Sequence, residues 1–295
     1  MPLLDQEPAG DVKTLEDLLG IAKAMERDAV RRYTLLAGLM ERRGEHDTAA
    51  TFRRLVAEEE GHVDAVDGWA RTLGLQASDE VEFEKRLPPE IANSWRALSE
   101  RTRLTPHQAL SLAVLNEQRA FAFYSYIAAL STDEAIRRHA EELAHEELGH
   151  AALLRRDRRE AYHRERRNVK VQPARAGTPA EMEQLATALF SAAAAEHTAL
   201  AAALRVFGDA PGATLVARIA EEESSFAEPR PGKPARHPGA SDCLRAAFRV
   251  SERLAEAFGD VAEHTADEEV LIRAQHLQEL VIGHLAELGE RIDAL

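Results

Sequence analysis

The chain has 295 residues, a formal net charge of −14 and one cysteine, Cys243. The acidic charge argues against a general nucleic-acid binder, and the single cysteine excludes a disulfide framework or a cysteine-only iron–sulfur or zinc site within one chain. No apolar run is long enough to span a membrane and no signal peptide is evident, so we expect a cytoplasmic protein. A composition rich in Ala, Leu, Glu and Arg with few aromatics predicts an all-α fold.

The first half of the chain predicts a four-helix bundle that follows a polar tail over residues 1–13. Apolar residues recur with helical period in four stretches, and Gly44 ends the first of them. The short breaks within each helix pair predict antiparallel neighbours. The long connection over 75–104, with a short helix expected near 91–99, suits a crossover to the far end of the bundle. The four helices are expected at about 14–43, at 45–73, from 106 to the turn at 131, and from there to about 164.

Two Glu-x-x-His turns fall on the inward, apolar stripes of the second and fourth helices. Glu59 and His62 form the first turn, and Glu147 and His150 form the second. A buried carboxylate or imidazole is costly unless it is paired or bound to a metal. These two turns therefore form the first half of a site hypothesis.

A single glutamate lies on the inward stripe of each of the other two helices. Glu26 lies 18 residues before Gly44, and Glu59 and His62 lie 15 and 18 after it. The groups of the second hairpin are spaced in nearly the same way about the turn at 131. At a rise of about 1.5 Å per residue, all of them come level near the middle of the bundle. The spacing predicts one buried metal site formed by Glu26, Glu59, His62, Glu117, Glu147 and His150. Off the stripes, His46, His139 and His145 are expected at the surface.

Residues 181–295 predict a second four-helix bundle, reached through a linker at 166–180 in which helical periodicity fails. Its helices are expected at about 181–207, 212–227, 241–263 and 267–293, with a Pro/Gly-rich crossing at 229–239. This bundle resembles a divergent internal copy of the first. In the aligned register Val281 replaces Glu147, Ser225 replaces His62, and the copy is expected to lack a complete metal site. The retained positions are Glu196 for Glu26, Glu222 for Glu59, Glu252 near the equivalent of Glu117, and His284 for His150.

Four carboxylates and two imidazoles suit iron or manganese better than a soft metal, and bundles of this layout hold such metal pairs. Residues 14–165 resemble the ferritin-like superfamily, most closely rubrerythrin-type di-iron domains. The motifs that carry the resemblance are Glu26 with Ala29 and Tyr33, Glu59-x-x-His62, Glu117 with Tyr124, and Glu147-x-x-His150.

The resemblance implies two iron ions, with manganese as the alternative metal. Glu59 and Glu147 would bridge the ions, and Glu26 and Glu117 would be terminal ligands. Each of His62 and His150 would then bind one ion. Tyr33 and Tyr124 follow the terminal glutamates by seven residues. They could hydrogen-bond ligand carboxylates or serve as plain core residues.

The implied function is a non-haem di-iron oxidoreductase that reduces hydrogen peroxide or dioxygen as Fe(II) is oxidised, with an external electron donor. The carboxylate that rubrerythrins carry one turn from the third-helix glutamate is missing, because Val114 and Ala120 stand there. Their four-cysteine module is missing as well. A di-iron hydroxylase of an organic substrate and a non-enzymatic, metal-stabilised interaction protein are the alternatives. Homo-oligomerisation is left open.

Overall fold

A computed structural model of the chain describes residues 4, 12–74, 83, 87–92, 95, 98–100, 102–167, 172–228 and 238–295. Every regular element in these ranges is a helix, which confirms the all-α prediction. Most of the predicted tail, the middle of the long connection, part of the linker and most of the crossing at 229–239 lie outside them. The chain divides into two compact units, Pro2–Trp95 with Ala109–Arg167, and Arg96–Gln108 with Asn168–Leu295.

Within the described residues, the first unit contains four long helices and one short one. A capping box at Thr14 starts α1, because its hydroxyl accepts from the backbone N–H of Asp17 and the Asp17 carboxylate accepts from the N–H of Thr14. Gly44, with φ of 76°, allows the tight turn into the next helix. Asp133 caps the last long helix through two backbone N–H groups. The elements are α1 (Leu15–Arg42), α2 (His46–Thr72), α4 (Pro89–Ala92), α5 (Pro106–Leu130) and α6 (Glu134–Arg166).

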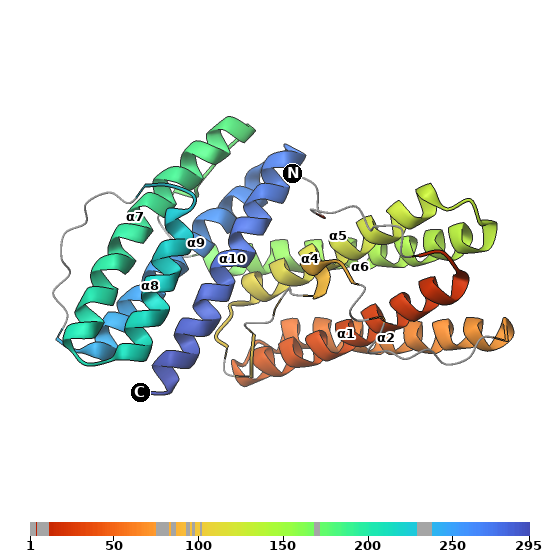
Figure 1. Cartoon of the computed structure of the whole chain (residues 1–295), viewed down its shortest axis with the longest axis horizontal. Helices are drawn as coiled ribbons and strands as arrows, with labels where there is room; N and C mark the ends of the chain where they lie inside the picture. The colour runs from red at the N-terminus through yellow and green to blue at the C-terminus, as the bar shows by residue number, and fades with distance from the viewer. Residues whose placement is uncertain are drawn as a thin grey trace. The chain divides into compact units, whose positions relative to one another are not determined.

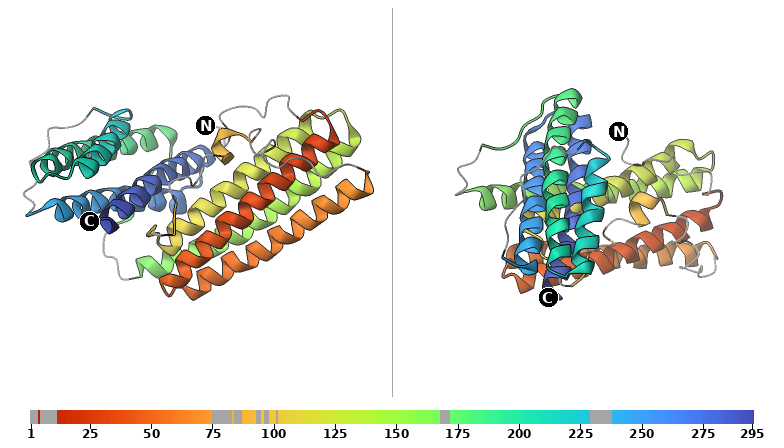
Figure 2. Two further views of the ribbon diagram at one scale, coloured as in Figure 1. Left: turned by 60° about the horizontal axis from the view of Figure 1, so that its bottom comes forward. Right: turned by 60° about the vertical axis from the view of Figure 1, so that its left-hand side comes forward.

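The four long helices of this unit lie alongside one another, as Figure 1 and both views of Figure 2 show. Their bounds agree with the predicted bounds to within about two residues, while the short helix starts and ends earlier than expected. The apolar stripes meet in one core that includes Leu18, Ile21, Phe123 and Leu143. Burying each such side chain contributes about 1.5–3 kcal/mol, so packing fixes which face of each helix turns inward. We call this unit the first bundle.

The second unit contains α7 (Pro179–Val206), α8 (Ala210–Ser224), α9 (Ala240–His264) and α10 (Glu268–Asp293). Thr178 caps α7 and Gly208, with φ of 80°, turns the chain into α8. The helices pack around a separate apolar core in which the rings of Phe190 and Phe258 lie 5.4 Å apart. This second bundle confirms two tandem all-α bundles.

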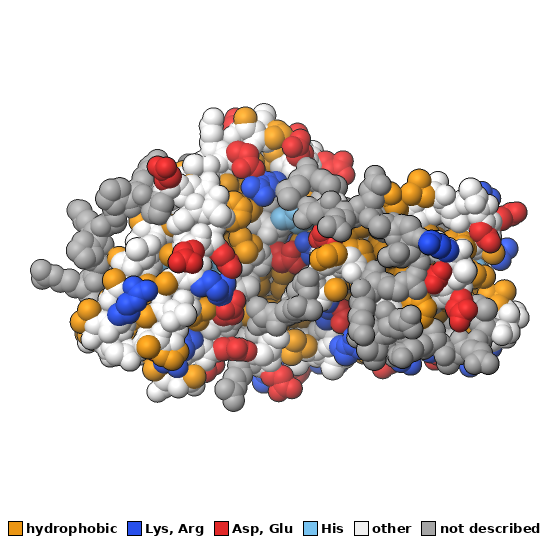
Figure 3. Space-filling model, in the orientation of Figure 1, with side chains coloured by type: hydrophobic (Ala, Val, Ile, Leu, Met, Phe, Trp, Pro, Cys, Tyr) orange, Lys and Arg blue, Asp and Glu red, His pale blue; other side chains and the backbone are white. Residues whose placement is uncertain are grey.

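The surface facing the viewer in Figure 3 carries acidic and basic side chains interspersed with scattered apolar ones. Single apolar residues on a surface are ordinary and mark no site. Among the described residues, no helix combines the length and the apolar character that a membrane crossing requires.

Candidate metal centre

The six predicted residues come from four helices and meet inside the first bundle. Glu26 lies on α1 and Glu117 on α5, while α2 and α6 each contribute one Glu-x-x-His turn. Five of the six residues are buried, and the side chain of His62 keeps 19% of its surface exposed. The structure therefore brings together all six residues that the spacing selected.

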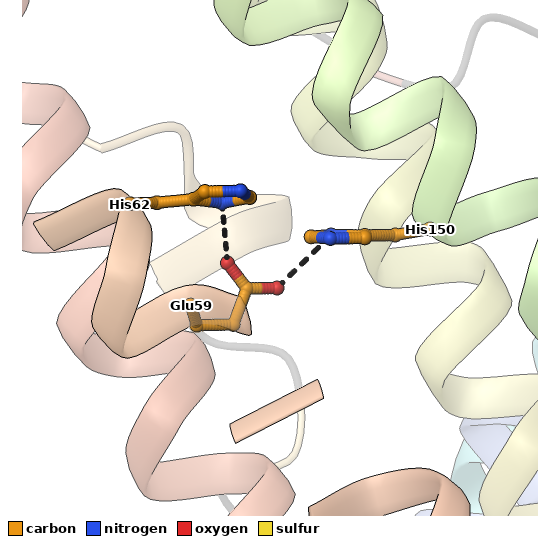
Figure 4. A group of neighbouring side chains, drawn as sticks. All are labelled: Glu59, His62 and His150. Atoms are coloured by element: carbon orange, nitrogen blue, oxygen red, sulfur yellow. Dashed lines mark hydrogen bonds and ion pairs between the residues drawn. The ribbon is translucent and has the colours of Figure 1, made fainter. Parts of the chain in front are cut away.

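Glu59 lies between the two imidazoles, as Figure 4 shows. Its Oε2 is 3.2 Å from Nδ1 of His62, and its Oε1 is 3.1 Å from Nδ1 of His150. The two rings stack with centroids 5.2 Å apart and planes at 16°. Glu26 joins this side of the cluster, with Oε2 3.7 Å from Nδ1 of His62. Both inner ring nitrogens thus face carboxylate oxygens.

His150 links this group to the other two glutamates. Its Nδ1 lies 3.2 Å from Oε2 of Glu117 and 3.9 Å from Oε2 of Glu147. Two groups result, Glu59–His62–His150 and Glu117–Glu147–His150, and within each group the three ligand atoms lie within 4.8 Å of one another. Because His150 belongs to both groups, the cluster is continuous. The individual roles of the six as ligands stay a prediction.

Burial and mutual repulsion hold protons on part of the cluster. Burial first, and then the neighbouring Glu59, raise the pKa of Glu26 well above its ordinary value. Burial and the nearby Glu117 likewise raise the pKa of Glu147. Burial acts in the same direction on Glu59, but hydrogen bonds from His150 and His62 outweigh it and lower the pKa of Glu59 to about 2.

The histidines take up protons in response. Hydrogen bonds to Glu26 and Glu59 raise the pKa of His62 to about 10. Burial opposes the same change at His150, yet hydrogen bonds to Glu117 and Glu59 raise the pKa of His150 to about 11. The metal-free cluster therefore balances its carboxylates with protons, which a bound cation would have to displace.

The residues fit a bound metal ion. Oε1 of Glu26 is buried and has no hydrogen-bond partner among the described residues. Grouped buried carboxylates are costly without compensating positive charge, and two imidazoles do not balance four of them. Carboxylate oxygens with imidazole nitrogens form the donor set that iron and manganese accept.

The two tyrosines differ in their contacts. The Tyr33 hydroxyl donates a hydrogen bond to Oε1 of Glu117, and the centroid of its ring lies 6.0 Å from that of Phe52 and 6.1 Å from that of Trp95. The fully buried Tyr124 hydroxyl has no hydrogen-bond partner among the described residues. Burial, and then the charges of the cluster, raise the pKa of Tyr124 well above its ordinary value, so this hydroxyl stays protonated.

Sequence reasoning missed several contacts of titratable groups in the first bundle. His139 is buried rather than exposed, because its ring packs on Trp69 at 4.6 Å and its Nδ1 lies 3.1 Å from Glu142. Glu58 and Glu146 approach the outer nitrogens of His150 and His62. The adjacent glutamates at 58–59 and 146–147 are the sequence feature that could have indicated these contacts, because each pair places a second carboxylate beside a cluster residue.

The second bundle corrects two assignments of inward residues. Glu196 is exposed and pairs with Arg253 at 3.0 Å, whereas the next residue, His197, is fully buried. Likewise Glu222 is partly exposed and Glu223 is fully buried, with Oε2 2.8 Å from Nδ1 of His197. Glu196 and Glu222 are therefore not the inward residues of α7 and α8. Glu222 nevertheless reaches the predicted equivalent of His150, because its Oε2 lies 2.8 Å from Nε2 of His284. Among the described residues, both groups suited to metal binding lie in the first bundle.

Comparison with known proteins gives one match. Residues 17–157, the segment that carries all six residues of the cluster, match the family model described as rubrerythrin. Searches among curated proteins and among solved structures find no match.

Proposed function

Residues 17–157 are a rubrerythrin-type domain of the ferritin-like di-iron class, and from this premise we propose that the chain is a non-haem di-iron oxidoreductase. Its substrate would be hydrogen peroxide or dioxygen, reduced as Fe(II) is oxidised. The observation that carries the proposal is the meeting of four carboxylates and two imidazoles from four helices in one cluster, in which Glu26 is joined through His62. An external electron donor would restore the reduced state.

Each cluster residue has a definite place in this proposal. Glu59 and Glu147 would bridge the two ions, with Glu26 and Glu117 as terminal ligands and one histidine on each ion. When bound, two Fe(II) ions supply the two electrons that, together with two protons, convert one hydrogen peroxide to two water molecules.

The protein supplies orientation, exclusion of water and protons. The Tyr33 hydroxyl restrains Glu117 through Oε1, so the other oxygen of this carboxylate, Oε2, stays directed at His150 and the cluster. The apolar core around the cluster keeps bulk water away and strengthens electrostatic contacts within it. The Tyr124 hydroxyl, buried and protonated, would donate a hydrogen bond to a substrate oxygen.

Elemental analysis and stopped-flow absorption test the proposal together. The purified protein should contain two iron ions per chain, and the Fe(II)-loaded form should oxidise rapidly when mixed with peroxide or dioxygen. Glu147→Gln should abolish the fast phase, and Glu141→Gln should preserve it, because Glu141 is an exposed carboxylate on the same helix. Zinc alone, or no metal in a folded protein, would refute the redox function.

The same experiment separates the two alternatives. A hydroxylase would show oxidation by dioxygen that depends on an added organic substrate. In an interaction protein that is only stabilised by metal, Glu147→Ala would change thermal stability and leave every oxidation rate unaltered.

A further inference from the structure

The two histidines of the cluster present their outer nitrogens to carboxylates of the opposite helix. Nε2 of His150 on α6 lies 3.6 Å from Oε2 of Glu58 on α2. Nε2 of His62 on α2 lies 4.0 Å from Oε2 of Glu146 on α6. The contacts are therefore reciprocal across the pair of helices.

Both outer carboxylates lie where the cluster meets the solvent. Their side chains are 42% and 38% exposed, compared with 9% for His150 and 19% for His62. Each directly precedes a cluster glutamate in the sequence, Glu58 before Glu59 and Glu146 before Glu147. Adjacent helical residues point in directions about 100° apart, so each Glu-Glu pair serves the inside of the cluster and its edge at once.

A histidine that binds metal through Nδ1 carries its proton on Nε2. An acceptor for that N–H fixes both the tautomer and the orientation of the ring, and a carboxylate also makes the ring a stronger ligand. The observed separations exceed a direct hydrogen bond but lie within the range of an ion pair, and exposed carboxylates of this kind also act through a bridging water.

We propose that Glu58 and Glu146 are positioning residues that hold the outer N–H groups of His150 and His62, so that both Nδ1 atoms stay directed at the cluster. This inference rests on the metal centre of the proposed function. It assigns a task to two carboxylates that otherwise count as ordinary charges on a solvated helix face.

Titration of the full-length protein with Co²⁺ tests the inference without reference to activity. Ala and Gln variants of Glu58 and Glu146 are compared with Glu60→Ala and Glu141→Ala, which remove exposed carboxylates from the same two helices. Calorimetry gives the affinity, and proton NMR of the Co²⁺-loaded protein detects the exchangeable N–H of each bound imidazole.

We expect each Ala variant at 58 or 146 to weaken Co²⁺ binding by about 10–100-fold, the usual effect of removing such a partner. The Gln variants keep an acceptor and should lose less. Glu58→Ala should speed solvent exchange of one N–H signal and Glu146→Ala that of the other, because each carboxylate serves one ring. Melting of the metal-free variants should match that of the wild type.

Two results would overturn the inference while leaving the metal centre intact. One is unchanged affinity and N–H exchange in both Ala variants. The other is an equal loss in Glu60→Ala and Glu141→Ala, which would show that only the general negative charge matters. If the wild-type protein binds no Co²⁺, the proposed centre itself is refuted and the inference falls with it.

Discussion

Glu147→Gln should make the metal-free first bundle more stable and the metal-loaded first bundle less stable. Glu147 is buried beside Glu117, and its raised pKa shows that its charged form is disfavoured there. Glutamine keeps the shape of the side chain and removes the ionisable group. A residue placed for metal binding, rather than for folding, is expected to respond in this way.

The distance between the two carboxylates sets the size of the stability change expected for Glu147→Gln. The ligand atoms of Glu117 and Glu147 lie within 4.8 Å of each other. Two full charges at that separation repel by about 3.5 kcal/mol at an effective dielectric constant of about 20. Protonation already relieves most of this repulsion, so we expect a gain of about 1 kcal/mol, which raises the melting temperature of a unit of this size by about 2–4 °C. Metal at a hundredfold excess over its dissociation constant should stabilise the wild type by about 2.7 kcal/mol and the variant by much less.

Differential scanning calorimetry in chelator and in excess Mn²⁺ measures both effects, with Glu141→Gln as the matched control. The variant should melt above the wild type in chelator and below it in metal. A large loss of stability in chelator would show that the contact of Glu147 with His150 at 3.9 Å holds the fold together, and the reasoning above would be wrong.

Three further predictions concern the tyrosine, the protons and the second bundle. Tyr33→Phe removes the hydrogen bond to Glu117, so the free energy of unfolding measured in urea should fall by about 1.5–3 kcal/mol, and Mn²⁺ should bind more weakly. Unchanged stability and Mn²⁺ binding would contradict the assigned contact. Metal affinity should rise with pH from 6 to 8, because His62 and His150, with pKa values of about 10 and 11, must each lose a proton to bind metal. Calorimetry in buffers of different ionisation heat should detect the released protons. Metal binding without proton release would count against ligation by these two rings. His197→Leu leaves Glu223 buried without its partner and should cost about 3–5 kcal/mol, whereas the double variant with Glu223→Leu should cost less. Urea unfolding of the two single variants and the double variant measures the coupling, and a double-variant loss equal to the sum of the two single losses would show that the pair is not coupled.

The sequence alone was sufficient to predict the helices and the six-residue cluster of the first bundle. A strong helical period fixed which face turns inward, and capping residues such as Thr14 and Asp133 fixed the helix starts. Counting residues from two turns was enough to bring Glu26 level with Glu59, because the rise of a helix is constant.

The sequence could not predict contacts that depend on side-chain direction across helices. The distances from Glu58 and Glu146 to the histidines follow from the spacing and rotation of α2 against α6, which no periodicity encodes. In the second bundle the predicted register makes Glu196 and Glu222 the equivalents of the inward Glu26 and Glu59, although a shift of one residue turns a side chain by about 100°. Only packing showed that His197 and Glu223 occupy the core.

The buried pair of His197 and Glu223 shows that the two bundles balance their carboxylates in different ways. In the second bundle the partners of these carboxylates are part of the chain, with His197 facing Glu223 and Arg218 facing Glu222. In the first bundle the balancing charge comes from solution, as protons or as metal. We therefore expect the stability of the first bundle to vary with the metal supply, while the stability of the second bundle stays constant. The second bundle then serves as an internal standard for measuring how much metal the first bundle has bound.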